Sequence, residues 1–260
     1  MERASAVPAK KHFTAERLRN FLSYLRSLLF TDSLICIYTV FWGTLSLVGS
    51  LLDAHGRWQH ACARAWSWLI LKTSGIRVSP EGLENVDPNR TTIYCANHPS
   101  AMDIPILLLT LPVQFRFLAK RPLFHVPFLG WHLQRSGHIP VDRERPREAI
   151  HSLDQAAKKI QEGRSVVLFP EGHRSRDGRL LPFKAGSFYL AIRAGVPVVP
   201  ITLNGTRYVL KPDTPHVRPG QTEVIAHPPI ETTGLTLDDV DALSEQVRKQ
   251  ILSRFKPPSD

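Results

Sequence analysis

The sequence has little cysteine and a shortage of negative charge, and both limit what the protein can be. Its 260 residues include three cysteines, Cys36, Cys62 and Cys95, which are widely spaced and set among apolar residues. This pattern favours neither a disulfide framework nor a zinc site, and is typical of buried thiols in a reducing compartment. Acidic residues number 23 against 33 lysines and arginines, a formal net charge of +10. That excess predicts an anionic partner: a phosphate-bearing substrate, a membrane surface or nucleic acid.

The chain also has no internal repeat and no low-complexity block. His125, His132, His138 and His151 do not form a His-x3-His or comparable pair with a nearby carboxylate, so we expect no catalytic metal. The length is sufficient for one sizeable hydrophobic core, or for one core with a small appendage.

The first 72 residues differ from the rest. Residues 1–26 are basic, and we expect part of them to be a disordered start. No charged residue occurs from Leu34 to Leu52, which is near the length of a membrane helix, and a second apolar run extends from Ala61 to Leu71. The first run lies too far from the start for a typical signal peptide. Three interpretations stay open: one full membrane span, a helical hairpin that dips into one leaflet, and a buried hairpin in a soluble core.

From Gly75 onward, short apolar runs alternate with helical patterns. Apolar residues recur at helical spacing from Arg147 to Gln161 and from Asp238 to Phe255. The alternation predicts an α/β fold with a mixed, largely parallel sheet that helices cover on both faces. We therefore expect a basic start with a membrane-associated hairpin over 1–72 and an α/β domain over 73–260. The expected strands are 77–78, 91–96, 115–119, 138–141, 165–169, 198–203 and 223–226.

The stretch Asn97-His98-Pro99-Ser100-Ala101-Met102-Asp103 follows a β-rich run and precedes an apolar segment, so we expect it at a strand-to-helix junction. Ligands of open α/β sheets bind outside the carboxyl ends of the strands. A histidine can move a proton near neutral pH, and a carboxylate can fix its tautomer. On one continuous helix, a spacing of five residues puts two side chains about 140° apart. His98 and Asp103 can therefore meet only if His98 lies at or before the first turn, and Pro99, favoured at the first helical position, predicts that junction.

Further charged residues follow other expected strands or begin a helix. Arg143 ends the stretch GHIPVDR, Arg174 lies in FPEGHRS, Lys184 begins a helix and Lys120 follows a strand. Each of them alone fits an ordinary solvated surface charge. Their common placement favours a cationic pocket for a phosphate, because guanidinium groups suit bidentate phosphate contacts.

Residues from about 70 to 230 resemble the glycerolipid acyltransferase family, and most closely the 1-acyl-glycerol-3-phosphate acyltransferases. Four blocks match in order: NHPSAMD the Asn-His-x4-Asp block, GHIPVDR the Gly-x-Ile-x-x-Asp-Arg block, FPEGHRS the Phe-Pro-Glu-Gly-Thr-Arg-Ser block, and VPVVPI the Val-Pro-Val-x-Pro block. Lys120 also falls where the family places a lysine. His173 departs from the pattern, because threonine is usual there. The apolar N-terminal hairpin is similar to the membrane-docking segment of bacterial members.

This resemblance implies direct acyl transfer to the sn-2 hydroxyl of lysophosphatidic acid, giving phosphatidic acid. The donor would be acyl-CoA or acyl-carrier protein, a co-substrate, and no cofactor is expected. His98 would act as general base and Asp103 would orient it, as in a triad without the serine. No Gly-x-Ser-x-Gly occurs in the chain, so a covalent acyl-serine is not expected, and Ser100 is expected to be a helix-start hydroxyl.

The resemblance also implies a set of residues that hold the glycerol phosphate: Lys120, Arg143, Glu171, Gly172 and Arg174. Lys120 is in addition a candidate to neutralise the thioester oxyanion. Because a carboxylate repels phosphate, we expect Glu171 to orient Arg174 or a backbone amide. Supporting roles are expected for Asn97 and Lys184.

The expected setting is the cytoplasmic face of a membrane, the inner membrane if the source is bacterial. Both donors are cytoplasmic and residues 1–26 are basic, which favours a leaflet-dipping hairpin over a full span. Membrane lipid is an expected partner and nucleic acid is not, because the cations lack the aromatic interleaving of a stacking platform. Part of the loop Phe124–Trp131 is expected to line the acyl groove.

Two alternatives stay open. The acceptor can be another lysophospholipid or an amino-acid lyso-lipid, which the unusual His173 suggests. From a different class, the net charge also fits a non-catalytic basic module that binds membranes or nucleic acid.

Overall fold

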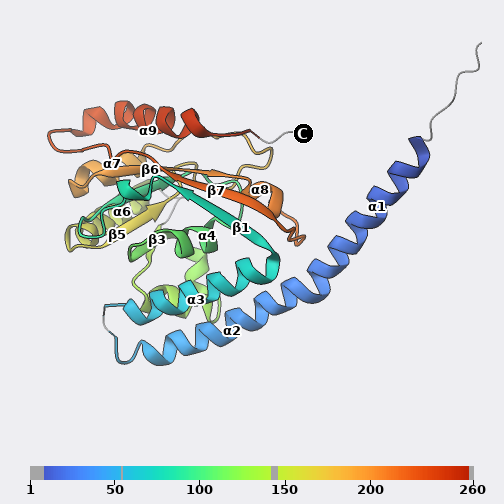
Figure 1. Ribbon diagram of the computed structural model, residues 1–260. Coiled ribbons are helices and arrows are strands. Elements are labelled where there is room, and N and C mark those ends of the chain that lie inside the picture. Colours follow the sequence, from blue (N-terminus) through green and yellow to red (C-terminus); the bar gives the residue numbers. More distant parts are fainter. Residues whose placement is uncertain (1–8, 54, 142–145, 258–260) are drawn as a thin grey trace, which may run out of the picture.

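The protein is an α/β domain preceded by a long apolar helix that extends beyond it (Figure 1). The computed structural model describes the backbone of residues 9–53, 55–141 and 146–257, and their side chains except at 9–16 and 146–149. Within these residues the sheet has seven strands in the order β1-β7-β6-β2-β5-β3-β4.

Most of the sheet is parallel. Five strands run in one direction: β2 (Ile93–Ala96), β3 (Phe115–Lys120), β4 (Ile139–Val141), β5 (Ser165–Leu168) and β6 (Val198–Asn204). β7 (Gly220–Ala226) is antiparallel to β6, and β1 (Ile76–Glu81) is parallel to β7. The predicted mixed, largely parallel sheet is therefore confirmed.

Alternating residues of the central strands face two separate cores. Tyr94 and Ala96 belong to one hydrophobic cluster, whereas Ile93 and Cys95 belong to the other. Both faces are buried, which explains why these strands are nearly continuous apolar runs. On the first face lie α3 (Arg57–Ser74) and α4 (Asp103–Thr110); on the second lie α6 (Pro146–Gln161), α7 (Gly186–Ala194) and α9 (Val240–Arg254).

The N-terminal segment is one continuous helix with a π-helical turn in its middle. It comprises α1 (Ala9–Arg26), η1 (Ser27–Thr31) and α2 (Asp32–Gly49), so residues 9–26 of the basic start are helical, and residues 1–8, the rest of it, lie outside the described residues. The π turn fastens the helix to the domain, because the Val217 amide donates to Ser27 Oγ at 2.7 Å and Ser27 Oγ donates to the Pro215 carbonyl at 3.1 Å.

The hairpin of α2 and α3 is not a buried core hairpin. Residues 17–49 form a helix that is long and apolar enough to cross a membrane, yet only 6% of its most apolar window is buried. Phe21, Leu29, Ile37 and Phe41 are among its exposed apolar side chains. Of the two helices of the hairpin, α3 supplies buried apolar side chains to the core, among them Cys62, Ile70 and Leu71. The division of the chain near residue 72 stays a prediction.

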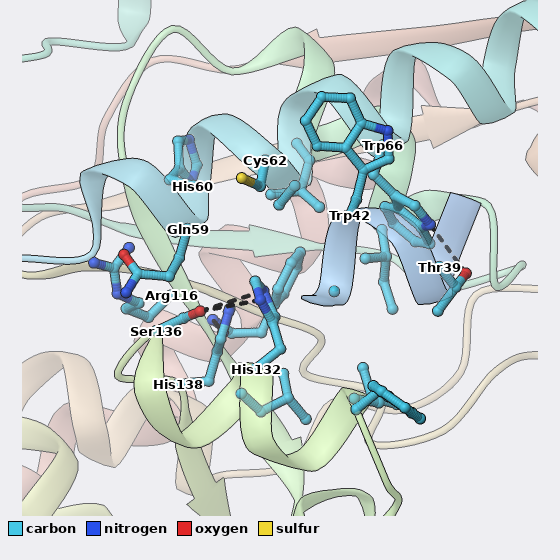
Figure 2. A pocket seen from close by; sticks show the side chains of 18 residues that line it. Thr39, Trp42, Gln59, His60, Cys62, Trp66, Arg116, His132, Ser136 and His138 are labelled. Atoms are coloured by element: carbon cyan, nitrogen blue, oxygen red, sulfur yellow. Dashed lines mark hydrogen bonds between the residues drawn. The ribbon is translucent and has the colours of Figure 1, made fainter. Parts of the chain in front are cut away.

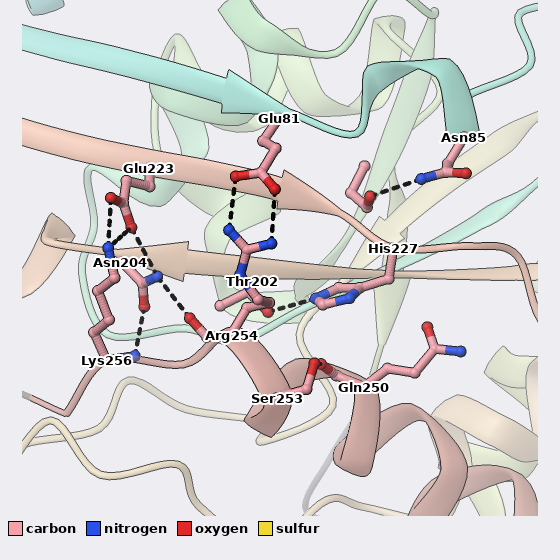
Figure 3. A network of polar contacts seen from close by, with 11 residues as sticks. Glu81, Asn85, Thr202, Asn204, Glu223, His227, Gln250, Ser253, Arg254 and Lys256 are labelled. Carbon is pink, nitrogen blue, oxygen red and sulfur yellow. Dashed lines mark hydrogen bonds and ion pairs between the residues drawn. The ribbon is translucent and has the colours of Figure 1, made fainter.

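Polar contacts attach the C-terminal helix to the sheet, and the remaining elements are short. The expected Pro-broken loop contains a 3-10 turn, η3 (Arg121–His125), and the helix α5 (Leu129–Arg135). At the end of α9, Arg254 donates two hydrogen bonds of 2.7 Å to Glu81 on β1, and Lys256 binds Glu223 on β7 (Figure 3). The other short elements are η2 (Leu83–Asn85), α8 (Thr206–Val209) and η4 (Leu237–Asp239).

Candidate active site

The site begins at the loop between β2 and α4. β2 ends at Ala96 and α4 begins at Asp103, so residues 97–102 cross from the sheet to the helix. The buried Asn97 fixes the start of this loop: its Nδ2 donates to the Leu203 carbonyl at 2.9 Å, and its Oδ1 accepts the Leu203 amide at 2.7 Å. Two hydrogen bonds to the neighbouring strand β6 therefore set the position from which His98 projects.

His98 and Asp103 form a direct pair. His98 Nδ1 lies 2.7 Å from Asp103 Oδ2, and the same oxygen accepts the Ser100 amide at 2.9 Å. Asp103 is fully buried. The meeting of the two side chains at a bent junction is confirmed. The expected place of Pro99 at the first helical position is wrong, because the helix begins four residues later, at Asp103.

Ser100 has a structural part in this junction. Its hydroxyl accepts the Met102 amide at 3.1 Å just before the helix and donates to the Leu210 carbonyl at 2.8 Å. Both bonds are to backbone groups, which agrees with the expected helix-start hydroxyl.

The imidazole of His98 is positioned by a ring stack as well as by its hydrogen bond to Asp103. Its ring stacks on Phe169, with centroids 3.8 Å apart and planes 15° apart. Within the described part of the chain Nε2 makes no hydrogen bond, and the side chain keeps 15% of its surface exposed. The hydrogen bond at Nδ1 places the acceptor lone pair at Nε2, which is the nitrogen that can take a proton from a substrate.

Glu171 supports the backbone of His98. Its Oε1 accepts the His98 amide at 2.6 Å and its Oε2 accepts the Leu181 amide at 2.9 Å, while the Ser175 amide donates to the His98 carbonyl at 3.1 Å. Burial raises the pKa of Glu171, and the two amide hydrogen bonds act in the opposite direction. Of the two partners expected for Glu171, the structure shows the backbone amide. Its place in a phosphate-binding set stays a prediction.

The predicted cations are brought together only in part. Gly172 adopts φ +80°, and a Cβ there would lie 2.8 Å from Lys184 Cε and 3.1 Å from Nζ, so the lysine side chain runs over this glycine. Arg174 is half-buried in the same loop, and Lys120 is exposed at the carboxyl end of β3, on the same edge of the sheet. Arg143 lies outside the described residues. No described hydrogen bond joins Lys120 or Arg174 to His98.

An apolar cavity of about 120 Å³ lies between the hairpin and the sheet (Figure 2). Trp42 from α2, Trp66 from α3 and Phe117 from β3 line it, and Phe117 has its ring centroid 6.2 Å from that of Phe169, the ring that stacks on His98. None of the described residues that the sequence predicts for catalysis or phosphate binding lines this cavity. The motifs did not reveal it because its walls come from five separate elements, α2, α3, α4, β3 and α5.

One end of the cavity is polar. In Figure 2, Gln59, His60, Arg116, His132, Ser136 and His138 gather at the end away from Thr39. Burial lowers the pKa of His132 to about 4 and holds that of His138 well below its usual range, so both imidazoles are neutral at pH 7. Phe128 and Leu129 also line the cavity, so part of the loop Phe124–Trp131 faces it.

Comparison with known proteins identifies the family. A family model described as Acyltransferase matches residues 77–204. A 1-acyl-sn-glycerol-3-phosphate acyltransferase of Saccharomyces cerevisiae is 33% identical over 240 residues, 91% of this chain and 78% of that protein. The chloroplastic enzyme of that name from Brassica napus is 35% identical over 204 residues, 77% of this chain but 57% of that protein. The chain thus spans little more than half the length of the plant relative.

A solved structure agrees with these sequence matches. The crystal structure of the 1-acyl-sn-glycerophosphate acyltransferase from Thermotoga maritima superposes with a TM-score of 0.73 at 26% identity, covering 92% of this chain and 99% of that one. The likeness therefore includes the N-terminal hairpin as well as the sheet. With the His98–Asp103 pair at the carboxyl edge of the sheet, these matches show that the chain belongs to the 1-acyl-sn-glycerol-3-phosphate acyltransferase family.

Proposed function

We propose that the protein transfers a fatty acyl group from acyl-CoA or acyl-carrier protein to the sn-2 hydroxyl of lysophosphatidic acid. The observation that carries this proposal is the 2.7 Å contact between His98 Nδ1 and the buried Asp103, with Nε2 left for a substrate. The names of the relatives from yeast and Thermotoga, which specify this acceptor class, support the choice.

In the proposed reaction His98 Nε2 takes the proton of the acceptor hydroxyl as its oxygen attacks the thioester carbonyl carbon. The new C–O bond gives a tetrahedral oxyanion, and its collapse breaks the C–S bond. The imidazolium then returns the proton to the departing thiolate. Asp103 stabilises the imidazolium and keeps the proton of the neutral ring on Nδ1, while the Phe169 stack fixes the ring plane.

We propose that the phosphate of the acceptor binds the cations at the carboxyl edge of the sheet, the edge that carries His98. The Lys184 side chain packs against Gly172, which has no side chain of its own. Arg174 lies in the same loop as Gly172, next to Ser175, whose amide donates to the His98 carbonyl. Lys120 is the last residue of β3, and Arg143 comes after β4 in the sequence; β3 and β4 are the two strands at one end of the sheet. All of these cations follow strands on the β5 side of β2, the strand that leads to His98. Together they would bind the phosphate, with Lys120 also able to stabilise the oxyanion.

We place the acyl chain in the apolar cavity and the hairpin on a membrane. Phe117 lines the cavity and lies beside Phe169, the ring that stacks on His98. Helices α2 and α3 form part of the cavity wall, and their outer faces expose apolar side chains. A lysophospholipid is itself a membrane component, so a hairpin lying in one leaflet brings the site to its acceptor. Cytoplasmic donors place the domain on the cytoplasmic face.

An acceptor and donor panel tests the proposal. Purified protein in detergent should transfer labelled acyl chains to lysophosphatidic acid, and an acceptor without phosphate, such as a monoacylglycerol, should react far more slowly. Equal rates with the two acceptors would refute the phosphate pocket. The panel also decides the second candidate, another lyso-lipid acceptor, which the exposed His173 in the Glu171–Ser175 loop motivates.

A further inference from the structure

A second cleft lies at the amino ends of the strands, on the opposite edge of the sheet from His98. Its volume is about 270 Å³, and the turn before α3, the start of β3, the end of α5 and the segment before β5 form its walls. Four arginines line it, Arg57, Arg116, Arg135 and Arg164, whereas Glu162, which lies 3.6 Å from Arg164 Nη2, is the one acid among its lining residues. Such an imbalance in a concave site favours an anion.

Arg116 is a buried cation that forms no ion pair with a carboxylate of the described residues, although the charge of Asp53 raises its pKa by less than that of Arg164 lowers it. Its Nη1 donates to the Phe115 carbonyl at 3.0 Å and its Nη2 to the His55 carbonyl at 2.9 Å, and 7% of the residue is exposed. Its Nε is buried and makes no hydrogen bond within the described chain. A buried guanidinium is costly unless it is paired and its donors are satisfied, so this side chain is incomplete without a ligand.

The unpartnered nitrogen lies beside a glycine of the cleft wall, close to a second arginine. Gly137 lines the cleft, and a Cβ on it would lie 3.5 Å from Arg116 Nε and 3.6 Å from Arg164 Nη1. Two guanidinium groups thus approach the same glycine. Burial lowers the pKa of Arg116 to about 10, and the charge of Arg164 acts in the same direction. An anion between the two groups would remove this repulsion and supply the missing acceptor.

We infer that this cleft binds a phosphate group, carried by a membrane lipid headgroup or free in solution, at a site separate from the catalytic edge. Four guanidinium groups match the charge and the bidentate geometry of a phosphate. The turn that contains His55 is flanked in sequence by the exposed apolar residues Leu51 and Leu52, 72% and 95% exposed, and Trp58. An apolar rim beside a basic cleft is compatible with a headgroup at a bilayer surface.

Hydrogen exchange of the full chain in detergent localises the site. Inorganic phosphate at fixed ionic strength should protect amides 114–116 and 135–137, apart from any protection of 171–176 at the catalytic edge. The variant Arg135→Gln/Arg164→Gln removes two exposed arginines and should weaken the protection at 114–116 and 135–137 by about tenfold or more in phosphate concentration. The control Arg77→Gln/Arg193→Gln removes two exposed arginines away from the cleft and should leave it unchanged.

Vesicles distinguish the sources of the phosphate. Protection of the same amides by phosphatidylcholine vesicles containing phosphatidylglycerol, but not by pure phosphatidylcholine, with no effect of inorganic phosphate, assigns a lipid headgroup. Protection by inorganic phosphate alone assigns a soluble ligand. The inference is overturned if neither probe protects 114–116 and 135–137, or if the double variant and wild type respond equally.

Discussion

Replacing Glu171 by glutamine tests how the catalytic histidine is held. The carboxylate accepts the amides of His98 and Leu181 at 2.6 and 2.9 Å, and 2% of the residue is exposed. Glutamine offers one acceptor oxygen, so one buried amide would face an NH2 group instead. Losing one charge-assisted hydrogen bond and leaving a buried donor unpaired should lower the free energy of unfolding by about 2–3 kcal/mol.

The same change should slow the reaction without weakening acceptor binding. If the His98 backbone moves by about 1 Å, kcat is expected to fall by about 100-fold. KM for lysophosphatidic acid should change little, because Glu171 contacts backbone amides rather than the acceptor. The control Glu245→Gln alters an exposed acid on α9 and should leave the free energy of unfolding within about 0.5 kcal/mol of wild type. Denaturant titration and initial rates supply both readouts. A raised KM with unchanged kcat would show that Glu171 binds the acceptor and that the positioning role is wrong.

Three further predictions concern the pair, the buried histidines and the cavity. Asp103→Asn should lower kcat by about 1,000-fold in the acyl-transfer assay, because an amide does not stabilise the imidazolium; a normal rate would contradict the pairing. The pKa of His132 is about 4 in the fold and 6.5 ordinarily, so the unfolded chain alone gains this proton as pH falls. The free energy of unfolding should therefore drop by about 2 kcal/mol between pH 7 and pH 5 for this residue, and His132→Gln should flatten that slope. Gly43→Leu fills the cavity from α2 and should shift donor preference to shorter chains, whereas the exposed Thr44→Leu should not; an unchanged chain-length profile for Gly43→Leu would remove the cavity from the acyl path.

The pattern of apolar residues was sufficient to predict most strands of the sheet, because the central strands are buried on both faces and are therefore continuous apolar runs. Successive residues such as Ile93 and Tyr94 belong to opposite cores, as an α/β arrangement requires. The motif at His98 and Asp103 predicted their contact, since a five-residue spacing is workable only at a bend. Pro99 was misplaced because the helix begins only at Asp103, and the amides of Ser100 and Met102 in the loop before it donate to the side chains of Asp103 and Ser100.

Features assembled from distant segments could not be predicted. Trp42, Phe117 and His132 meet in one cavity although 90 residues separate the first from the last, and none of them belongs to a motif. The start at Ala9 of the N-terminal helix was missed, because its basic composition suggests a solvated tail. In the sequence, Arg116 is not distinguished from the other residues of its strand. The structure shows that Gly137 and the turn before α3 pack around it and bury its charge without a paired anion.

The most direct test of the account is acyl transfer by His98→Ala in comparison with wild type. The hydrogen bonds that Glu171 and Ser175 make to residue 98 involve its backbone, so alanine keeps the loop and removes the imidazole alone. With labelled acyl-CoA or acyl-carrier protein and lysophosphatidic acid, kcat should fall by about 1,000-fold or more while the binding of lysophosphatidic acid is retained. A His98→Ala protein that forms phosphatidic acid at the wild-type rate would contradict general-base catalysis by this residue.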